Sequence, residues 1–217
     1  MFVKVCGITS EEDGLLAVAL GADALGFVLA PSPRQVTPTV AGDIARHLPS
    51  EVITVGVFRN ESKERVVELV HTIGLKAAQL HGRETVADAR WVAERVPLTI
   101  MAFAAGDRAI ANAAAYGADL VLLDAPSPGS GEVFDWRLAE GVADGTRLLL
   151  AGGLDPDNVA KAIALVHPWG VDVSSGVESL PGVKDPGKLR SFIVTAKAAA
   201  TPEWESPDEA PFDWQDT

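Results

Sequence analysis

The sequence of 217 residues predicts an α/β fold, a single (β/α)8 TIM barrel with a short acidic C-terminal extension. Three observations lead to this prediction. Eight short apolar runs alternate with helix-like segments, a glycine motif returns before every second run, and no change in composition divides the chain before about residue 200. Strands that alternate with helices of about 10 to 15 residues are typical of βαβ units and a parallel sheet.

The eight apolar runs are rich in β-branched residues and begin 21 to 29 residues apart. We expect strands at 2–6, 24–29, 53–58, 77–80, 98–103, 120–124, 147–151 and 171–174. Eight βα units in about 200 residues, with no seam between two halves, favour a closed barrel over an open doubly wound sheet. An open sheet that binds a dinucleotide should carry a glycine-rich fingerprint after its first strand, and only one glycine stands there.

Glycines mark the entry into every second strand. Gly21, Gly74, Gly117 and Gly170 stand just before, or at the start of, the second, fourth, sixth and eighth runs. Glycine readily adopts the left-handed conformation in which a helix ends before the chain turns into a strand. We therefore expect a helix C-terminus at each of these positions.

The last 17 residues differ from the rest of the chain. Residues 201–217 contain six Asp or Glu, three Pro and no Lys or Arg, so they carry half of the net charge of −12. Such a composition is typical of disordered segments. We expect a catalytic barrel domain at 1–200 and an acidic, disordered tail at 201–217, although Trp204, Phe212 and Trp214 leave open whether one face of the tail docks.

Composition excludes several classes of protein. The negative net charge argues against nucleic acid as the main partner. A single cysteine cannot form an internal disulfide, which fits a reducing compartment. We find neither a secretory signal nor an apolar stretch of the roughly 20 residues that a membrane span requires. We expect a cytoplasmic protein with no membrane partner, and a monomer or a homodimer.

In this type of barrel the active site lies at the C-terminal ends of the strands. These ends carry a thiol, a cation, an imidazole, a carboxylate, an amide and two loops of Gly and Ser. In chain order the candidates are Cys6, Arg34, Gln79, His81, Asp124, Gly152, Gly153, Ser174, Ser175 and Gly176. This set is typical of a site for a small molecule.

The two late loops, "LAGGL" and "VSSGVE", predict a phosphate site. Loops after the seventh and eighth strands, together with a short helix, bind phosphate repeatedly in this barrel. Glycine lets backbone N–H groups approach the anion, and the Ser hydroxyls add donors. The alternative is that both loops are only tight turns.

Cys6 ends the first strand and Asp124 ends the sixth, so a thiol and a carboxyl form a plausible acid–base pair. The alternatives are a buried thiol that only fills space and a solvated loop carboxylate. Arg34 directly follows the rigid segment Pro31–Pro33 and is suited to bind a substrate carboxylate with its fork of donors. His81 is equally consistent with a ligand contact and with a structural hydrogen bond. We expect no metal, because no His/Cys spacing or carboxylate cluster typical of a metal site occurs.

Several segments resemble the phosphoribosylanthranilate isomerase family of tryptophan biosynthesis. They are "KVCGIT", "GADALGFVLAPSPRQV", "VGVF", "QLHG", "LLD" with "PGSGEVFDW", "LAGGLDPDNV" and "GVDVSSGVESLPGVKD". The segments occur in family order between residue 3 and about residue 195. The resemblance implies a (β/α)8 barrel without cofactor or metal. It also implies an Amadori rearrangement of a small phosphorylated substrate, N-(5-phosphoribosyl)anthranilate.

The resemblance also implies roles for individual residues. Cys6 matches the general base, Asp124 the general acid and Arg34 the residue that binds the anthranilate carboxylate. The glycine and serine loops match the phosphate site, and Asp172 matches a residue that orients the substrate. We expect the substrate-binding set to be Arg34, Gln79, His81 and Asp172.

Two alternatives remain open at this stage. A related isomerase of histidine biosynthesis, or a form that accepts both substrates, performs the same rearrangement. That family carries an aspartate on the first strand where this chain has Cys6, so the thiol favours the tryptophan-pathway substrate. The other alternative is a barrel without activity that serves as a scaffold.

Overall fold

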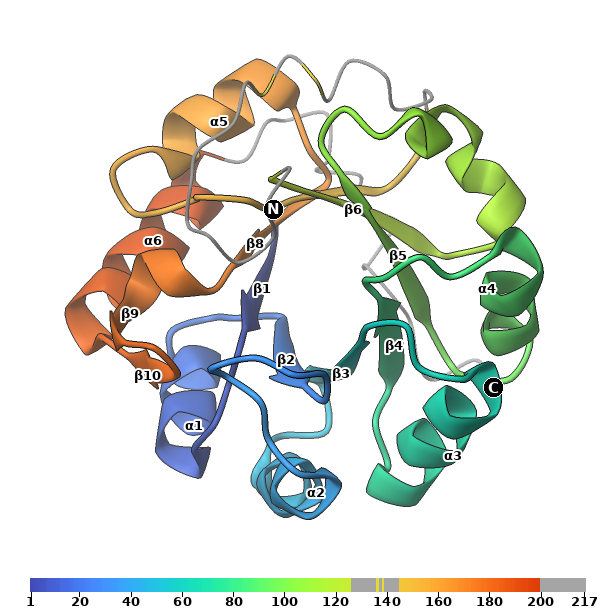
Figure 1. The fold of residues 1–217 in the computed structure, drawn as a ribbon. Helices are drawn as coiled ribbons and strands as arrows, with labels where there is room; N and C mark the ends of the chain where they lie inside the picture. Colours follow the sequence, from blue (N-terminus) through green and yellow to red (C-terminus); the bar gives the residue numbers. More distant parts are fainter. Residues whose placement is uncertain (126–135, 137, 139–144, 200–217) are drawn as a thin grey trace.

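The computed structural model describes residues 1–125, 136, 138 and 145–199. Eight parallel strands form a closed barrel in which each strand pairs with the next and β8 pairs with β1 (Figure 1). The strands are β1 (Phe2–Cys6), β2 (Ala24–Val28), β3 (Ile53–Phe58), β4 (Ala77–Leu80), β5 (Thr99–Ala104), β6 (Leu120–Asp124), β7 (Leu148–Leu150) and β8 (Gly170–Val173). The predicted fold class is confirmed. The strands begin and end as predicted or one residue away, because apolar β-branched runs mark buried strands well.

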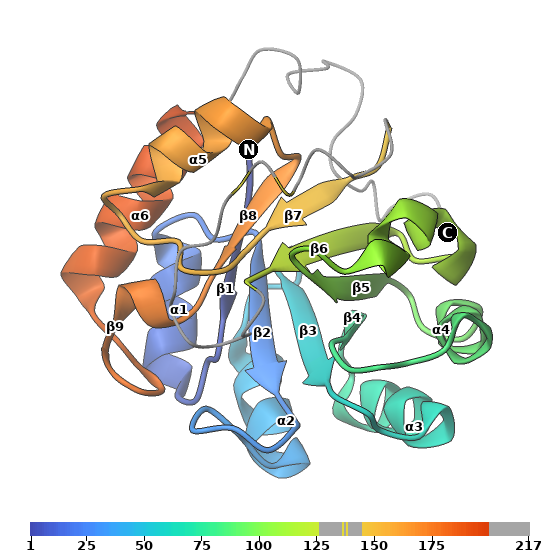
Figure 2. The ribbon, with the colours of Figure 1, turned by 45° about the horizontal axis from the view of Figure 1, so that its top comes forward.

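Helices surround the barrel on its outside, as Figures 1 and 2 show. They are α1 (Glu11–Ala19), α2 (Pro38–His47), α3 (Lys63–Ile73), α4 (Val86–Ala93), the 3-10 helix η1 (Arg108–Tyr116), α5 (Val159–Val166), the 3-10 turn η3 (Ser175–Val177) and α6 (Pro186–Ala198). Ser10, Thr37, Ser62 and Thr85 cap the first four α-helices, each accepting a hydrogen bond from a backbone N–H in the first turn. Among the described residues, no helix is long and apolar enough to cross a membrane.

The glycine prediction is confirmed at three of its four positions. Gly21, Gly74 and Gly117 have φ of 102°, 78° and 69°, in the left-handed region. Gly74 and Gly117 are the C-caps of α3 and η1. These residues therefore end one helical segment and let the chain turn into the next strand.

The prediction is wrong at Gly170, which lies inside β8. His167, at φ 49°, is the left-handed residue that ends α5. A Cβ atom at Gly170 would lie 2.7 Å from Leu149 Cδ2 and 2.9 Å from the carbonyl oxygen of Phe2. Close packing between neighbouring strands, and not a turn, requires glycine there.

The interior of the barrel changes from apolar to polar along the strands. At the N-terminal ends, Phe2 stacks on Trp169 with 4.6 Å between ring centroids. Lys4 and Asp172 face each other one layer further along, because β1 and β8 pair these two residues. The polar side chains of Gln79 and Asp124 follow towards the C-terminal ends, and both are buried. The barrel therefore presents its chemical groups at one end only.

A two-stranded antiparallel hairpin that the sequence analysis missed follows β8. It consists of β9 (Glu178–Leu180) and β10 (Val183–Lys184). Thr9 Oγ1 donates a hydrogen bond to the Gly182 carbonyl, and Asp13 Oδ2 accepts one from the Lys184 backbone N–H at 3.1 Å. The hairpin is thus attached to the loop that follows Cys6 and to the first turn of α1. The predicted domain boundary at residue 200 comes directly after α6, and residues 201–217 lie outside the described residues.

Candidate active site

A cavity of about 350 Å³ opens at the C-terminal ends of the strands. Its size lies within the range of small-molecule sites. Ten of the eleven predicted site residues line it, and they are Cys6, Arg34, Gln79, His81, Asp124, Gly152, Gly153, Asp172, Ser174 and Ser175. Gly176 is not among the lining residues. No group of three or more His, Cys, Asp or Glu suited to a metal occurs within the described ranges, and the expected absence of a metal stays a prediction.

The Cys6 thiol lies at the end of β1 and is 8% exposed. Its sulfur packs against Gly26 of β2, where a Cβ atom would lie only 2.7 Å from Sγ. Burial raises the pKa of the thiol, Lys4 lowers it, Asp172 raises it and Lys184 lowers it, and the net pKa lies above the ordinary value. The free thiol is therefore held mainly protonated at neutral pH, with two cations close enough to stabilise the thiolate.

Lys4 and Asp172 form an ion pair inside the barrel below Cys6. Lys4 Nζ lies 2.8 Å from Asp172 Oδ1, and the Lys4 side chain is fully buried. Burial lowers the pKa of Lys4, but Asp172 and Cys6 outweigh this effect, so the pKa lies above its usual value. The ammonium also lies near Gly26, because a Cβ atom there would be 3.2 Å from Nζ. Lys4 is thus a permanent cation next to the thiol.

Asp124, His81 and Gln79 form a short polar chain across the ends of β4 and β6. His81 Nε2 lies 3.4 Å from Asp124 Oδ2, and His81 Nδ1 lies 3.0 Å from Gln79 Nε2. The other carboxylate oxygen of Asp124 accepts a hydrogen bond of 2.7 Å from the Ala125 backbone N–H. If Gln79 donates to Nδ1, then Nε2 carries the imidazole proton and faces the carboxyl group. The Ala125 N–H therefore fixes one oxygen of Asp124, and among the described residues His81 Nε2 has no hydrogen-bond partner although it lies near the other oxygen.

The two predicted phosphate loops touch each other. Gly152 and Gly153 have φ of 82° and 66°, and Asn158 Nδ2 donates a hydrogen bond of 2.8 Å to the Gly153 carbonyl. A Cβ atom at Gly176 would lie 1.9 Å from the carbonyl oxygen of Leu154. Gly176 therefore allows the close approach of the loops, whereas the other loop glycines line the cavity. The short helix predicted after the eighth strand is the 3-10 turn η3.

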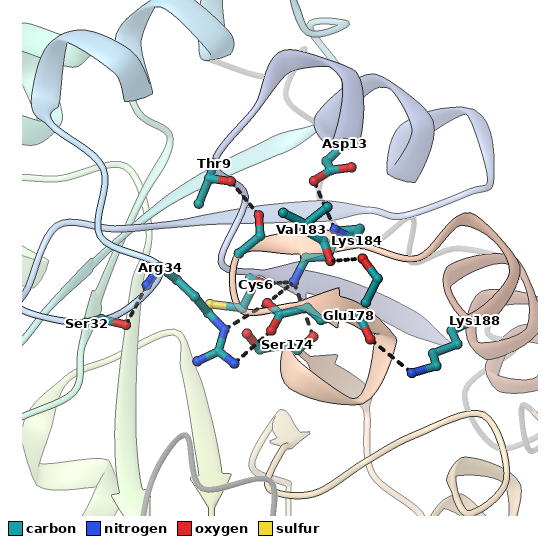
Figure 3. Close-up of polar contacts among 12 residues, drawn as sticks. Cys6, Thr9, Asp13, Ser32, Arg34, Ser174, Glu178, Val183, Lys184 and Lys188 are labelled. Carbon is teal, nitrogen blue, oxygen red and sulfur yellow. Dashed lines mark hydrogen bonds and ion pairs between the residues drawn. The ribbon is translucent and has the colours of Figure 1, made fainter.

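Arg34 lines the cavity with one edge of its guanidinium already occupied. Nε and Nη2 donate hydrogen bonds of 2.8 Å each to the two carboxylate oxygens of Glu178 (Figure 3). Lys184 Nζ lies 3.0 Å from Glu178 Oε1 and donates to the carbonyls of Cys6 and Ser174 at 2.7 and 3.2 Å. These contacts connect the Arg34 loop, the end of β1 and the end of β8.

Sequence reasoning missed Lys4, Glu178 and Lys184. It considered only residues at strand ends, whereas Lys4 lies inside a strand and the other two lie in the hairpin. A lysine within the apolar run "FVKVC" was a usable signal, because a charge at that position of a barrel strand must find a buried partner. Glu178 and Lys184 lie within the segment "GVDVSSGVESLPGVKD" that carries the family resemblance, and this was the usable signal for both, although charged residues after the last strand are ordinary in a surface loop.

Comparison with known proteins agrees with this geometry. The family model for N-(5'phosphoribosyl)anthranilate (PRA) isomerase matches residues 3–195. An N-(5'-phosphoribosyl)anthranilate isomerase from Desulforudis audaxviator is 48% identical over 204 residues, covering 91% of this chain and 98% of the relative.

Two solved structures are similar along almost their whole length. A phosphoribosyl anthranilate isomerase from Thermus thermophilus is 44% identical with a TM-score of 0.86, covering 91% of this chain and 99% of the other. A second such isomerase, in complex with reduced 1-(o-carboxyphenylamino)-1-deoxyribulose 5-phosphate, is 41% identical with a TM-score of 0.80 and the same coverage.

Proposed function

Because this chain belongs to the N-(5'-phosphoribosyl)anthranilate isomerase family, we propose that Cys6 and Asp124 carry out the two proton transfers of that reaction. The enzyme acts in tryptophan biosynthesis and converts N-(5-phosphoribosyl)anthranilate into 1-(2-carboxyphenylamino)-1-deoxyribulose 5-phosphate, an Amadori rearrangement. The observation that carries the assignment of roles is one cavity lined by the thiol, the carboxyl and both glycine loops.

In the first step Asp124, as the general acid, donates a proton to the furanose ring oxygen. The C1′–O bond breaks, the nitrogen lone pair forms a C1′=N bond, and an open-chain iminium results. The Ala125 N–H supports this step by holding one carboxyl oxygen of Asp124, and His81 Nε2 lies 3.4 Å from the other. The positive iminium then acidifies the hydrogen on C2′.

In the second step the Cys6 thiolate removes the proton from C2′, and the electron pair of the C–H bond forms the C1′=C2′ bond of an enolamine. The enolamine takes up a proton at C1′ while the hydroxyl group on C2′ loses its proton and becomes the ketone, so two protons are gained, two are lost and the atoms balance as an isomerisation. Burial favours the neutral thiol, and Lys4 and Lys184 offset part of that cost. Base catalysis of this type contributes about 10²- to 10⁴-fold to the rate.

The substrate presents an anion at each end, and the cavity offers a group for each. The loops with Gly152, Gly153, Ser174 and Ser175 would bind the phosphate through backbone N–H groups and hydroxyls. Arg34 would bind the anthranilate carboxylate, and Asp172 at the cavity wall would orient the sugar hydroxyls. Binding energy at both ends orients the reacting carbons between them.

The experiment that tests the function is a turnover assay on the purified protein. Loss of anthranilate-type fluorescence follows the conversion of N-(5-phosphoribosyl)anthranilate, and the phosphoribosylated substrate of histidine biosynthesis is assayed in parallel. We expect turnover of the first and, because Cys6 replaces an aspartate base, little of the second. A preparation that turns over neither substrate contradicts the assignment.

The remaining expectations concern the setting of the enzyme. We propose a cytoplasmic protein, because the lone cysteine fits a reducing compartment. We also propose that residues 1–200 form the complete catalytic domain, as a monomer or a homodimer that requires no metal or cofactor. Size-exclusion chromatography with light scattering tests the oligomeric state, and activity after dialysis against a chelator tests the metal.

A further inference from the structure

We propose that Glu178 is a positioning residue for the recognition of the substrate carboxylate and that it acts through Arg34. This inference rests on the proposed carboxylate-binding role of Arg34 and deepens it. The carboxylate of Glu178 accepts both Nε and Nη2 of Arg34 at 2.8 Å, and the side chain of Glu178 is almost completely buried.

The guanidinium group has two edges that can each bind one carboxylate. Nε and Nη2 form the side edge, and Nη1 with the second N–H of Nη2 forms the end edge. Both guanidinium contacts in Figure 3 run from the side edge of Arg34 to Glu178. Within the described ranges the end edge makes no hydrogen bond, so we assign it to a second carboxylate. Glu178 fixes the plane and the direction in which Arg34 presents this edge to the cavity.

Lys184 holds Glu178 in this position. Its Nζ has three N–H groups and three acceptors, which are Glu178 Oε1 and the carbonyls of Cys6 and Ser174. Only an ammonium can satisfy three acceptors, so Lys184 carries a charge although burial lowers its pKa. Burial raises the pKa of Glu178, but Arg34 and Lys184 outweigh it, so the pKa lies below its usual value and the carboxylate is ionised.

The charges of this group fit a carboxylate ligand. Arg34 and Lys184 contribute two positive charges and Glu178 one negative charge, which leaves one positive charge at the cavity. A substrate carboxylate neutralises it. Without Lys184, the pair of Arg34 and Glu178 would be neutral and would attract an anion weakly.

The hairpin that carries Glu178 is itself attached at several points. Lys188 Nζ, on α6, donates a hydrogen bond of 3.0 Å to the Glu178 carbonyl. Thr9 and Asp13 bind the other end of the hairpin through Gly182 and the Lys184 backbone. The hydrogen bonds hold the hairpin backbone in place, and with it the buried carboxylate of Glu178. This arrangement is expected of a residue that supports a binding residue such as Arg34.

The test compares two ligands that differ only in the carboxylate. Reductive amination of ribose 5-phosphate with anthranilate and with aniline gives such a pair, and their inhibition constants are measured against N-(5-phosphoribosyl)anthranilate. Glu178→Gln keeps the volume but has one acceptor oxygen. The variant Glu178→Gln/Lys184→Met keeps the net charge of the group, so it isolates orientation from charge and leaves no unpaired buried lysine.

We expect both variants to reduce the preference for the carboxylate ligand about tenfold or more, since hydrogen bonds to charged groups contribute that much. Binding of the aniline compound should change by less than about threefold, and the loss in turnover should appear in KM more than in kcat. Glu178→Asp should restore part of the preference. Asp88→Asn, which breaks the 2.8 Å ion pair with Lys63 outside the cavity lining, is the control.

The variant Arg34→Met distinguishes a failure of the positioning role of Glu178 from a failure of the carboxylate-binding role of Arg34. If Arg34→Met abolishes the preference and the charge-matched Glu178 variant keeps it, Glu178 does not position Arg34 and the inference is wrong. Equal losses for both ligands in the Glu178 variants also overturn it, because they indicate a purely structural role. A preference that survives Arg34→Met means that Arg34 does not bind the carboxylate, and the proposed site assignment then fails together with the inference.

Discussion

Cys6 works in a site where burial and charge oppose each other. Burial in the barrel favours the neutral thiol, and the carboxylate of Asp172 adds to that preference. Lys4 and Lys184 act in the other direction. A thiol held mainly protonated in the free enzyme is protected from oxidation and alkylation, because only the thiolate is a good nucleophile. In the proposed mechanism the positive charge of the iminium intermediate then stabilises the Cys6 thiolate.

Cys6→Ala tests the general base directly. We expect kcat to fall by about 10²- to 10⁴-fold, since that is the usual contribution of base catalysis. Substrate binding should change little, because only one small sulfur atom is removed and the proposed binding groups in Arg34 and the two loops are unchanged. Single-turnover kinetics with a binding assay measures both. A variant that kept more than about a tenth of the wild-type kcat would exclude Cys6 as the base.

Asp124→Asn and Arg34→Met separate catalysis from binding. The amide cannot donate the proton to the ring oxygen, so Asp124→Asn should lower kcat by about 10²-fold or more with little change in KM. In its proposed role Arg34 binds a carboxylate that is present in the ground state, so Arg34→Met should mainly raise KM. Steady-state kinetics on both variants decides, and the reverse pattern means that the two roles are exchanged.

The titration of Cys6 gives a pH dependence with a known sign. Cys6 is the only cysteine, so its alkylation by iodoacetamide reports one thiol. The rate rises with pH as the thiolate forms, and the midpoint should lie above the roughly 8.5 of a free thiol. Lys4→Met removes a cation that lowers the pKa and should move the midpoint to higher pH.

Asp172→Asn is the matched variant for this titration. It removes an anion that raises the pKa of Cys6, so the midpoint should move to lower pH. Circular dichroism spectra serve as the check on folding for both variants. Midpoints that stay in place, or that move in the same direction in both variants, contradict the electrostatic role of the Lys4–Asp172 pair.

For single residues, the sequence predicts which candidate site residues stand at the ends of strands. It does not predict which side chains pair with them in the folded protein. Cys6 and Asp124 were identifiable because they end apolar runs, and barrel topology brings all strand ends to one face. The sequence does not contain the distances that pair Arg34 with Glu178, which lies 144 positions away. Such long-range pairs form only when the barrel closes, so a local sequence pattern does not predict them.

Among the elements, the loops after β7 and β8 form the tightest contact of the site. Gly176 faces the Leu154 carbonyl so closely that no side chain fits between them. Gly74, at the end of α3, has a left-handed φ but nothing within 4 Å of its Cβ position. Gly176 is thus required because a side chain would clash, whereas Gly74 is favoured only because of its left-handed backbone conformation.

We therefore expect Gly74→Ala to affect the stability of the fold and Gly176→Ala to affect substrate binding. Gly74→Ala should cost about 1 kcal/mol of stability, because an alanine is strained at positive φ, and leave KM and kcat unchanged. Gly176→Ala should push the two loops apart and raise KM by about tenfold or more. Thermal melts and steady-state kinetics measure both effects. A Gly176→Ala enzyme with wild-type KM would show that the contact between the loops is unimportant for the phosphate.

Regular elements were predictable where one physical rule dominates. Apolar runs gave the eight strands, and left-handed glycines gave three helix ends. Gly170 was misread because glycine serves two purposes, a turn or a close approach, and only the packing against β1 and β7 decides between them. The β9–β10 hairpin was missed because its strands are only three and two residues long, too short for a period of two to appear.

On the scale of the whole molecule, the eight strands of the barrel and all eleven predicted site residues lie among the described residues up to α6. The family model ends at residue 195, inside this helix. Leu189, Phe192 and Ile193 of α6 are fully or almost fully buried in the core, so α6 is an integral part of the barrel. The boundary at residue 200 therefore separates a packed helix from a segment with a different composition.

A chain that ends at Ala200 should fold and turn over the substrate like the full-length protein, because every predicted site residue lies before that position. Its net charge changes from −12 to −6, since six acidic residues and no basic residue are removed. Losing such a segment should change the solubility of the protein and leave its catalytic activity unchanged.

The alternative is that Trp204, Phe212 and Trp214 pack on the barrel. Thermal melts separate the two cases, because in a protein of this size a loss of about 2 to 4 °C corresponds to roughly 1 kcal/mol of stability. Equal melting temperatures and equal kcat/KM support an appendage, whereas a drop of more than a few degrees makes the tail part of the folded domain.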